Sequence, residues 1–335
     1  MTALWITGTG AVGPCGLGLS EDGSGESARG HRLVPEGLPL KEGFPAAAMR
    51  WQDASSLWWI NAARQALGAE GACPETGQVV GLGWGSNPPV MALAEQAHRH
   101  GFSAMAPSHF PYSVGNAPSA QAGILLHMRG PAVTLCAKES AGLAALAEGA
   151  RCLSAGLCSE LVAGGVDHLD PFLQQILRPL RRGSGVPAGE GAYALKLQCA
   201  REAPARAQAR VAAWTGLSAP APPHLFPEAS PILGRTLDSL LARAGWEGAS
   251  VDLAVLPEDT PVLKAASDGL RSSRLPAAAP FSFQRLLGAC GASWAGAAGL
   301  VSRRLASGSA RRAVLLALAT GGACWAVALE APRAQ

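Results

Sequence analysis

One segment of the sequence gathers side chains that could do covalent or acid–base chemistry. It is Gly130–Gly142, which reads Gly-Pro-Ala-Val-Thr-Leu-Cys-Ala-Lys-Glu-Ser-Ala-Gly. A cysteine thiolate is a nucleophile, and a carboxylate such as that of Glu139 can act as a general base. Cys136, however, falls inside the short apolar run 131–136, so we expect a strand there, with this thiol buried and inert in the core.

Glu139 allows three interpretations. As a general base it would need a proton partner and oxyanion donors beside it. As a structural residue it could accept backbone N–H bonds at the start of the following helix, where the helix dipole favours an anion. As a pairing residue it could lie against Lys138, its neighbour in the chain. We favour the structural interpretations of this carboxylate over the catalytic one.

Metal and cofactor motifs are weak. The eight cysteines form no CxxC pair, and the close histidine pair, His98 and His100, is two residues apart on a helical pattern, so its rings do not share a face. Gly8, Gly10 and Gly13 match a dinucleotide-binding pattern, but no acidic residue ends a second strand behind them. The sequence therefore predicts no metal site and no cofactor.

Short apolar runs alternate with helical patterns along the chain. In the first half we expect strands at 3–7, 79–83, 131–136, 161–164 and 192–197, and helices at 55–68, 90–98, 117–128 and 140–155. In the second half we expect a strand at 208–216, a helix at 231–245, a strand at 251–256, a helix at 291–306 and a strand pair at 313–329. The first strand should end at the glycine-rich run that begins with Gly8. This alternation predicts an α/β fold with largely buried sheets.

Composition excludes several classes of protein. With 48% hydrophobic and 15% charged residues, the chain can bury a large core and is not globally disordered. A net charge of +3, spread along the chain, is no electrostatic footprint for nucleic acid. No stretch approaches the roughly 20 apolar residues of a membrane-spanning helix, and the amino terminus lacks the pattern of a signal peptide. We expect a soluble, cytoplasmic protein that binds neither membranes nor nucleic acid.

Five segments, taken in order, resemble the β-ketoacyl synthase family. They are Ile6–Pro14, Pro107–Pro111 with Asn116 downstream, Gly130–Gly142, Ala163–Asp167 and Gly189–Ala192. The resemblance implies a thiolase-like, five-layered α/β/α/β/α fold built from two pseudo-repeated halves, which we place at 1–200 and 201–335. It also implies a dimer and a family chemistry of carbon–carbon bond formation on carrier-bound acyl chains.

Active members of this family use a cysteine, two histidines and a lysine. By resemblance, the cysteine position falls on Glu139, the first histidine on Pro257, the lysine on Gln284 and the second histidine on Ala289. A carboxylate cannot take the place of a thiolate that holds the acyl chain as a thioester. The family's carboxy-terminal gating loop is reduced to Ala319–Gly322. The resemblance therefore implies a degenerate site without catalytic residues.

A degenerate ketosynthase fold has a use beside an active one. The resemblance implies a chain length factor of a type II polyketide synthase, with polyene and aryl polyene systems among the options. It would form a heterodimer with an active ketosynthase and share an acyl carrier protein with it. His109, Phe110 and Tyr112 lie on the segment that, by resemblance, reaches the partner's acyl tunnel. Trp84 is either a further tunnel residue or an ordinary core tryptophan.

Two alternatives give the chain an activity of its own. It would be a malonyl-carrier-protein decarboxylase that uses Glu139, or an acyltransferase that works through Glu139 or another residue. Either requires an acid–base partner beside the reacting group. Carrier proteins are acidic, so Arg178, Arg181 and Arg182 are candidates for steering their docking, although a solvated arginine cluster is the more common case.

Overall fold

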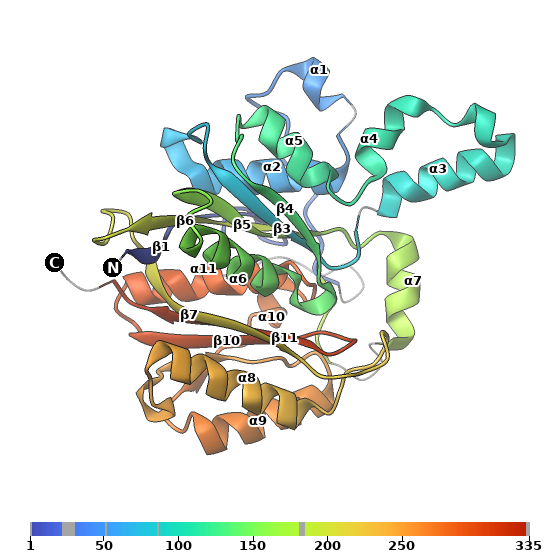
Figure 1. Cartoon of the computed structure of the whole chain (residues 1–335). Coiled ribbons are helices and arrows are strands. Elements are labelled where there is room, and N and C mark those ends of the chain that lie inside the picture. The colour runs from blue at the N-terminus through green and yellow to red at the C-terminus, as the bar shows by residue number, and fades with distance from the viewer. Residues whose placement is uncertain (1, 22–30, 51, 86, 181–184, 333–335) are drawn as a thin grey trace.

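The structure, a computed structural model, describes residues 2–21, 31–50, 52–85, 87–180 and 185–332. Figure 1 shows five layers, in which two sheets enclose a pair of helices and each sheet is covered on its outer face by further helices. The expected α/β architecture with α/β/α/β/α layering is therefore confirmed. The candidate docking residues Arg181 and Arg182 lie outside the described residues, as does the side chain of Arg178.

The strands form one continuous hydrogen-bonded path that folds into two layers. Its first part runs, in spatial order, through β4 (Ala132–Cys136), β3 (Gly77–Leu82), β5 (Glu160–Asp167), β6 (Gly191–Ala200) and β1 (Ala3–Gly13). Its second part continues through β7 (Ala209–Ser218), β11 (Ala323–Glu330), β10 (Arg312–Leu318), β8 (Leu253–Val255) and β9 (Ala279–Pro280), while β2 (Gly16–Leu17) pairs with β1. Strands β1 and β7 join the two layers, through pairs such as Leu4 with Val211.

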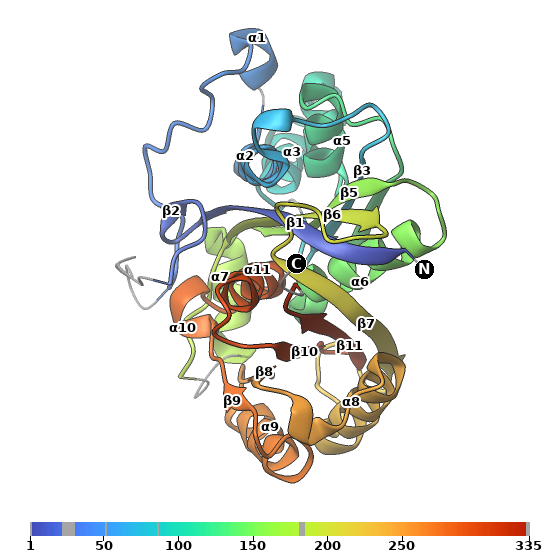
Figure 2. The same cartoon turned by 90° about the vertical axis from the view of Figure 1, so that its left-hand side faces the viewer.

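Helices fill the three remaining layers (Figures 1 and 2). The outer layers hold α2 (Ala54–Leu67) and α5 (Ala117–Leu125) on one side, and α8 (Ala229–Ala244) and α9 (Pro261–Arg274) on the other. The central layer holds α6 (Ala141–Ser154) and α11 (Ser293–Ala306). Further helices are α1 (Ala46–Met49), α7 (Pro171–Leu180) and α10 (Gln284–Leu287). Helix α6 is buried nearly all round, as an apolar helix between two sheets must be. No described helix has the length and apolar character needed to cross a membrane.

The glycine run near the amino terminus is part of a strand, so the expected strand end at Gly8 is wrong. Strand β1 continues to Gly13 and pairs with β6 along most of its length. A Cβ atom at Gly8 would lie 2.0 Å from the carbonyl oxygen of Ala66, and one at Gly10 would lie 2.0 Å from that of Ala62. Both carbonyls belong to α2. The glycines therefore let a helix lie directly on the strand, rather than making a turn.

A helical arm, residues 87–113, projects from the layered body (Figure 1). It consists of α3 (Asn87–His100), the 3₁₀ turns η3 (Phe102–Ala104) and η4 (Pro107–His109), and α4 (Phe110–Ser113). Large apolar side chains on this arm are uncovered. Phe102 is 84% exposed and Phe110 is 63% exposed. Exposed apolar side chains gathered on one segment are typical of a surface that another molecule covers.

Strand β4 forms the outer edge of the first sheet. Its residues are partly or fully exposed, and Cys136 at its end is exposed. The expected burial of this thiol is therefore wrong. A strand that is paired on one side leaves N–H and C=O groups and part of its side chains open to solvent, which a buried central strand does not.

Candidate functional site

The turn that carries Glu139 is a tight connection between β4 and α6. It forms the 3₁₀ element η5 (Lys138–Ser140), in which the Ser140 hydroxyl donates to the carbonyl oxygen of Ala137 at 2.8 Å. Lys138 has φ +48°, a left-handed conformation that non-glycine residues adopt at a cost. The turn thus holds two charged side chains at the amino end of the central helix α6.

Both charged side chains of this turn contact the second half of the chain. Glu139 Oε2 accepts the backbone N–H of Thr320 at 3.0 Å and its hydroxyl at 3.1 Å. Thr320 lies in the turn Ala319–Gly322 between β10 and β11. The Lys138 ammonium donates to the Thr320 carbonyl oxygen at 3.2 Å and to that of Pro223. We call this set of contacts the Glu139 latch, because it ties η5 to the β10–β11 turn.

The geometry distinguishes between the interpretations of Glu139. Its carboxylate accepts a backbone N–H, as the structural interpretation requires, but the donor is Thr320 and not an N–H of α6. No ion pair with Lys138 is found in the described part of the chain, since the lysine ammonium turns to two carbonyl oxygens. The sequence gives no signal for Thr320, which lies 181 positions away along the chain.

The turn is packed against the start of α11. A Cβ atom at Gly291 would lie 2.0 Å from the carbonyl oxygen of Lys138, so a side chain at position 291 would displace the turn. The Gly142 N–H, in the first turn of α6, donates to the Gly291 carbonyl oxygen at 2.8 Å. This close approach leaves no room for a bound group between η5 and residue 291.

Asp167 fixes the same region from the end of β5. It is 4% exposed, and its carboxylate accepts the N–H of Gly83 at 2.7 Å and of Ala292 at 2.8 Å. Burial raises the pKa of Asp167 to about 6, although these backbone donors act to lower it. The sequence marks Asp167 as the end of a family-like segment but not as the residue that joins β3 to α11.

The other three positions that the resemblance assigns to catalytic residues are buried. Pro257 follows β8, and its carbonyl oxygen accepts the Ser267 hydroxyl at 2.8 Å. Gln284 is 1% exposed, and its amide group has no hydrogen-bond partner among the described residues. Ala289 is 4% exposed and donates its N–H to the Pro187 carbonyl oxygen at 2.7 Å. None of the three side chains can transfer a proton near neutral pH.

The candidate tunnel residues lie in two separate places. Trp84 follows β3 and packs with a small cluster, Leu33, Leu169, Leu173 and Ala188. His109, Phe110 and Tyr112 lie on the arm, where His109 and Tyr112 are half-buried and Phe110 is exposed. Phe110 does not belong to the cluster around Trp84.

A carboxylate and an imidazole, those of Glu190 and His168, lie next to the Trp84 cluster. Glu190 accepts the N–H of Val34 at 2.9 Å and of Leu169 at 3.0 Å, and burial raises its pKa to about 7. His168 Nε2 is 3.9 Å from Glu190 Oε2, and burial lowers the pKa of this imidazole. The carboxylate joins two backbone segments. Within the described ranges, no three histidine, cysteine, aspartate or glutamate side chains are grouped to hold a metal ion.

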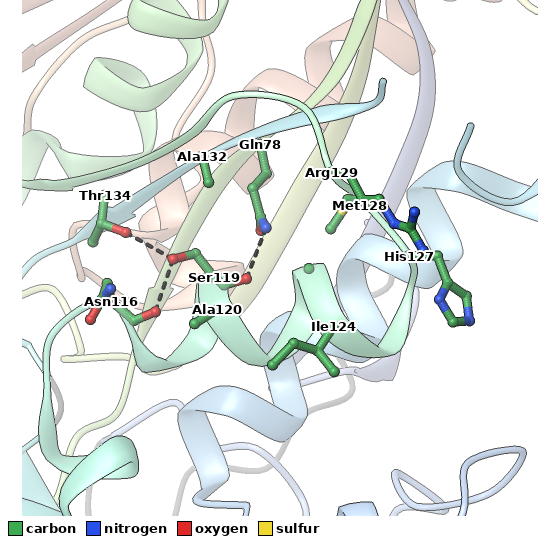
Figure 3. A pocket seen from close by; sticks show the side chains of 11 residues that line it. Gln78, Asn116, Ser119, Ala120, Ile124, His127, Met128, Arg129, Ala132 and Thr134 are labelled. Carbon is green, nitrogen blue, oxygen red and sulfur yellow. Dashed lines mark hydrogen bonds between the residues drawn. The ribbon is translucent and has the colours of Figure 1, made fainter. Parts of the chain in front are cut away.

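A groove of about 570 Å³ lies beside the free edge of β4 (Figure 3). Its floor is a hydrogen-bonded set in which Ser119 Oγ contacts Thr134 Oγ1 at 2.9 Å and the Gln78 amide donates to the Ser119 carbonyl oxygen at 2.8 Å. Ile124, which lines one side, is 67% exposed. His127 and Arg129 also line the groove, so it offers polar as well as apolar surface.

Comparison with known proteins finds one matching family model and several solved structures with a similar fold. Residues 41–181 match the family model for the N-terminal domain of β-ketoacyl synthases. A search of curated protein sequences returned no match. Among solved structures, one described as the ishigamide ketosynthase/chain length factor is similar at 20% identity and a TM-score of 0.82, and the match covers 98% of this chain and 99% of that one.

Two further solved structures share the fold. A β-ketoacyl synthase from Burkholderia phymatum matches with 16% identity and a TM-score of 0.85, over 99% of this chain and 100% of that one. A third, AntDE:AntF, is described as a type II PKS acyl-carrier protein in complex with its ketosynthase bound to the hexaketide, and matches with 16% identity, a TM-score of 0.79 and the same coverage. The family match thus covers residues 41–181, and the chain as a whole has the fold of these solved structures.

Proposed function

We propose that the chain is a non-catalytic, ketosynthase-like chain length factor, which pairs with an active ketosynthase and helps to set chain length in type II polyketide biosynthesis. The observation that carries the proposal is the Glu139 latch. A carboxylate, which cannot hold an acyl chain as a cysteine thioester does, stands at the position of the nucleophile. The same carboxylate accepts two hydrogen bonds from Thr320.

The remaining assigned positions support a non-catalytic role. Decarboxylation of a malonyl group and stabilisation of the resulting enolate require proton donors or oxyanion donors beside the reacting carbon. Pro257 and Ala289 offer no such side-chain group, and Gln284 is a neutral amide with 1% exposure. An enzyme that worked through Glu139 would need other groups to supply the proton.

Two surfaces of this chain suit a partner subunit. The free edge of β4 presents unpaired backbone groups beside the groove of Figure 3, and such an edge is a template for another chain. The arm presents Phe102 and Phe110 outward. We propose that the active ketosynthase covers both surfaces, that the arm reaches its acyl tunnel, and that an acyl carrier protein serves the pair. One similar structure is described as a ketosynthase/chain length factor, which supports this assignment.

Co-expression with the active ketosynthase tests the partnership. We expect a 1:1 heterodimer by size-exclusion chromatography with mass detection, and a lone chain that self-associates or stays poorly soluble, because its partner surface is uncovered. Ala132→Lys places a charge on the exposed edge residue of β4, and should weaken the heterodimer about tenfold or more. Ala306→Lys, at an exposed position on α11, is the matched control and should not. A stable monomer that ignores the ketosynthase would refute the proposal.

A separate assay addresses the decarboxylase alternative. Purified chain is incubated with malonyl-carrier protein, and release of carbon dioxide is followed. We expect no release above that of the carrier alone, since Glu139 is engaged by Thr320 and lacks a proton partner at the assigned positions. Release that disappears in Glu139→Ala would instead make the chain an enzyme.

A further inference from the structure

The groove beside β4 has basic residues at one end and none that is acidic. His127 and Arg129 lie at that end, and Asn116 and Thr134 lie at the other (Figure 3). None of the described residues that line the groove is an aspartate or a glutamate. The positive charge of Arg129 is therefore not balanced within the groove.

The side chain of Arg129 is not used by this chain. It is exposed, and among the described residues it makes neither a hydrogen bond nor an ion pair. The Arg129 N–H donates to the Pro74 carbonyl oxygen at 2.9 Å, which fixes the backbone and leaves the guanidinium free. Glu75, which follows Pro74, makes no ion pair with any described residue either. A guanidinium binds a carboxylate through two of its five N–H groups, so Arg129 is able to pair with an acid of another molecule.

The rest of this surface suits an extended segment. Ile124 is 67% exposed on one wall of the groove, and Ala120 and Ala132 are exposed beside it. Strand β4 is paired with β3 on one side, and its other side is the free edge of the sheet. A strand added to such an edge bonds through its backbone and places alternate side chains against the neighbouring surface. The occupant that fits is an extended segment with an apolar side chain and an acidic one.

A second copy of this chain does not supply the acid. The segment that it would bring to the edge, residues 127–138, contains no aspartate or glutamate. In an antiparallel pairing of two β4 edges, the amino end of one strand meets the carboxyl end of the other. Arg129 would then approach the end that carries Lys138 and Glu139, and Glu139 is already held by Thr320 of its own chain. Pairing with itself therefore gains this chain no free carboxylate.

We propose that the groove selects its partner by charge, and that it takes an edge segment of the active ketosynthase in which a carboxylate pairs with Arg129 and an apolar side chain packs on Ile124. The inference rests on the proposed function, because that function makes the ketosynthase the partner. It adds the chemistry that the partner must present and the reason why a second copy is not preferred. The imidazole of His127 supplies a further N–H donor at the same end of the groove. Complementary charge at an interface contributes to the choice of partner more than to raw affinity.

A carbodiimide crosslink in the purified heterodimer identifies the acid. Arg129→Lys keeps the positive charge and supplies an amine, which the reagent joins to a carboxylate in contact with it. The chain has only four lysines of its own, so the background is small. We expect mass spectrometry to find position 129 linked to an aspartate or glutamate of the ketosynthase. Arg243→Lys, at an exposed position on α8, is the matched control and should give no such link.

The affinity of the heterodimer measures what the charge contributes. Arg129→Gln should weaken it about fivefold or more at about 50 mM salt and by less at about 500 mM, because salt screens an ion pair at an interface. Arg243→Gln should leave the dissociation constant unchanged at both salt concentrations. Analytical ultracentrifugation of a dilution series makes the measurement. Because the Arg129 side chain contacts no described partner within the chain, its substitution should not unfold the protein.

The outcomes separate this inference from the proposed function. A heterodimer that forms with unchanged affinity in Arg129→Gln, or that gives no crosslink in Arg129→Lys, overturns the charge selection and leaves the partnership standing. A crosslink between two copies of this chain overturns it as well, because the edge then serves self-association. If the wild-type chain does not pair with the ketosynthase at all, both proposals fall.

Discussion

The Glu139 latch and the helical arm differ in where their interactions are made. At the latch, the charged side chains of η5 find donors and acceptors within the chain, in the β10–β11 turn and the loop around Pro223. On the arm, Phe102 and Phe110 are largely uncovered. The place that resembles an active site is closed by the chain's own contacts, and the apolar surface lies elsewhere. Under the proposed function, this chain acts through the arm and not through the latch.

The packing around the latch should be the most sensitive feature. Gly291→Ala puts a methyl group 2.0 Å from the Lys138 carbonyl oxygen, and should lower the free energy of unfolding by about 3 kcal/mol. Gly234→Ala, in the interior of α8 with no atom within 4 Å of the new methyl, should raise it by about 0.5–1 kcal/mol. Urea denaturation of the two variants measures the difference. Equal effects would mean that the latch region accommodates an added methyl group as easily as α8 does.

Substitutions on the arm should have the opposite profile, with a small effect on the free energy of unfolding and a large effect on the length of the product. Phe110→Ala should cost below about 1 kcal/mol of unfolding free energy, because the ring is 63% exposed, yet shift the heterodimer's products toward longer chains. His109→Ala and Tyr112→Ala should shift them in the same direction by less. Phe172→Ala, an exposed phenylalanine on α7, is the control. Chromatography of the released products, with the heterodimer verified by gel filtration, makes the measurement.

An unchanged length distribution in all the arm variants would contradict the assignment of the arm to the tunnel. Adding Trp84→Ala to Phe110→Ala then separates the two interpretations of the indole. A further shift would make Trp84 part of the same wall, and loss of stability without a shift would make it a core residue of its cluster.

The latch itself should matter for stability and not for the condensation rate. Glu139→Ala leaves the Thr320 N–H without its acceptor, and should cost about 1–3 kcal/mol of unfolding free energy. The condensation rate of an intact heterodimer should stay within about threefold, a barrier change below about 1 kcal/mol. Thr320→Val removes the hydroxyl but keeps the N–H, and should cost less. A rate loss of about a thousandfold in Glu139→Ala would assign the carboxylate a chemical role.

The smallest effect should be a pH dependence of stability through Glu190. Its pKa is raised by burial from 4.5 to about 7, so between these values the folded chain holds a proton that the unfolded chain releases. The contribution of Glu190 to stability is therefore complete below about pH 4.5 and lost as the pH rises to about 7. Glu190→Gln should remove this decline, as measured by urea midpoints across that range. Parallel curves for the two proteins would show that Glu190 does not titrate there.

Two other groups with shifted pKa values, Asp167 and His168, are present in both wild type and Glu190→Gln. Asp167, whose pKa burial raises to about 6, adds a decline of the same sign at lower pH. His168 acts in the opposite sense, because burial lowers its pKa and its contribution is lost as the pH falls. The difference between wild type and Glu190→Gln removes the contribution of Asp167, whereas His168, 3.9 Å from Glu190, is coupled to the substituted carboxylate.

Local patterns were sufficient for most of the fold. The helical pattern at 140–155 corresponds to α6 and the apolar run at 79–83 to β3, because their side-chain periodicity reports their own burial. The patterns failed where the environment comes from elsewhere in the chain. Gly8 and Gly10 resemble a turn, but they accommodate α2. Cys136 lies in an apolar run of the sequence, which predicts burial, yet its strand is at the edge of the sheet and the thiol is exposed.

The site was harder to predict for the same reason. The sequence identifies Glu139 as an unusual residue at a strand-to-helix turn, but its partner Thr320 is brought near by the pairing of β10 with β11 and by their place in the second layer. Which way the arm residues face depends equally on a tertiary arrangement that no local spacing encodes. The assignments of Trp84, His109, Phe110 and Tyr112 to a tunnel remain predictions.

The central position of β1 has a consequence for how the chain folds during synthesis. This strand is synthesised before both of its partners, β6, where Leu4 lies opposite Cys199, and β7, where Leu4 lies opposite Val211. Its apolar residues Trp5 and Ile6 therefore have no strand to pair with until β6 and β7 have emerged from the ribosome. Contacts so distant in sequence form slowly. We expect the nascent chain to depend on chaperones that hold this strand until its partners appear.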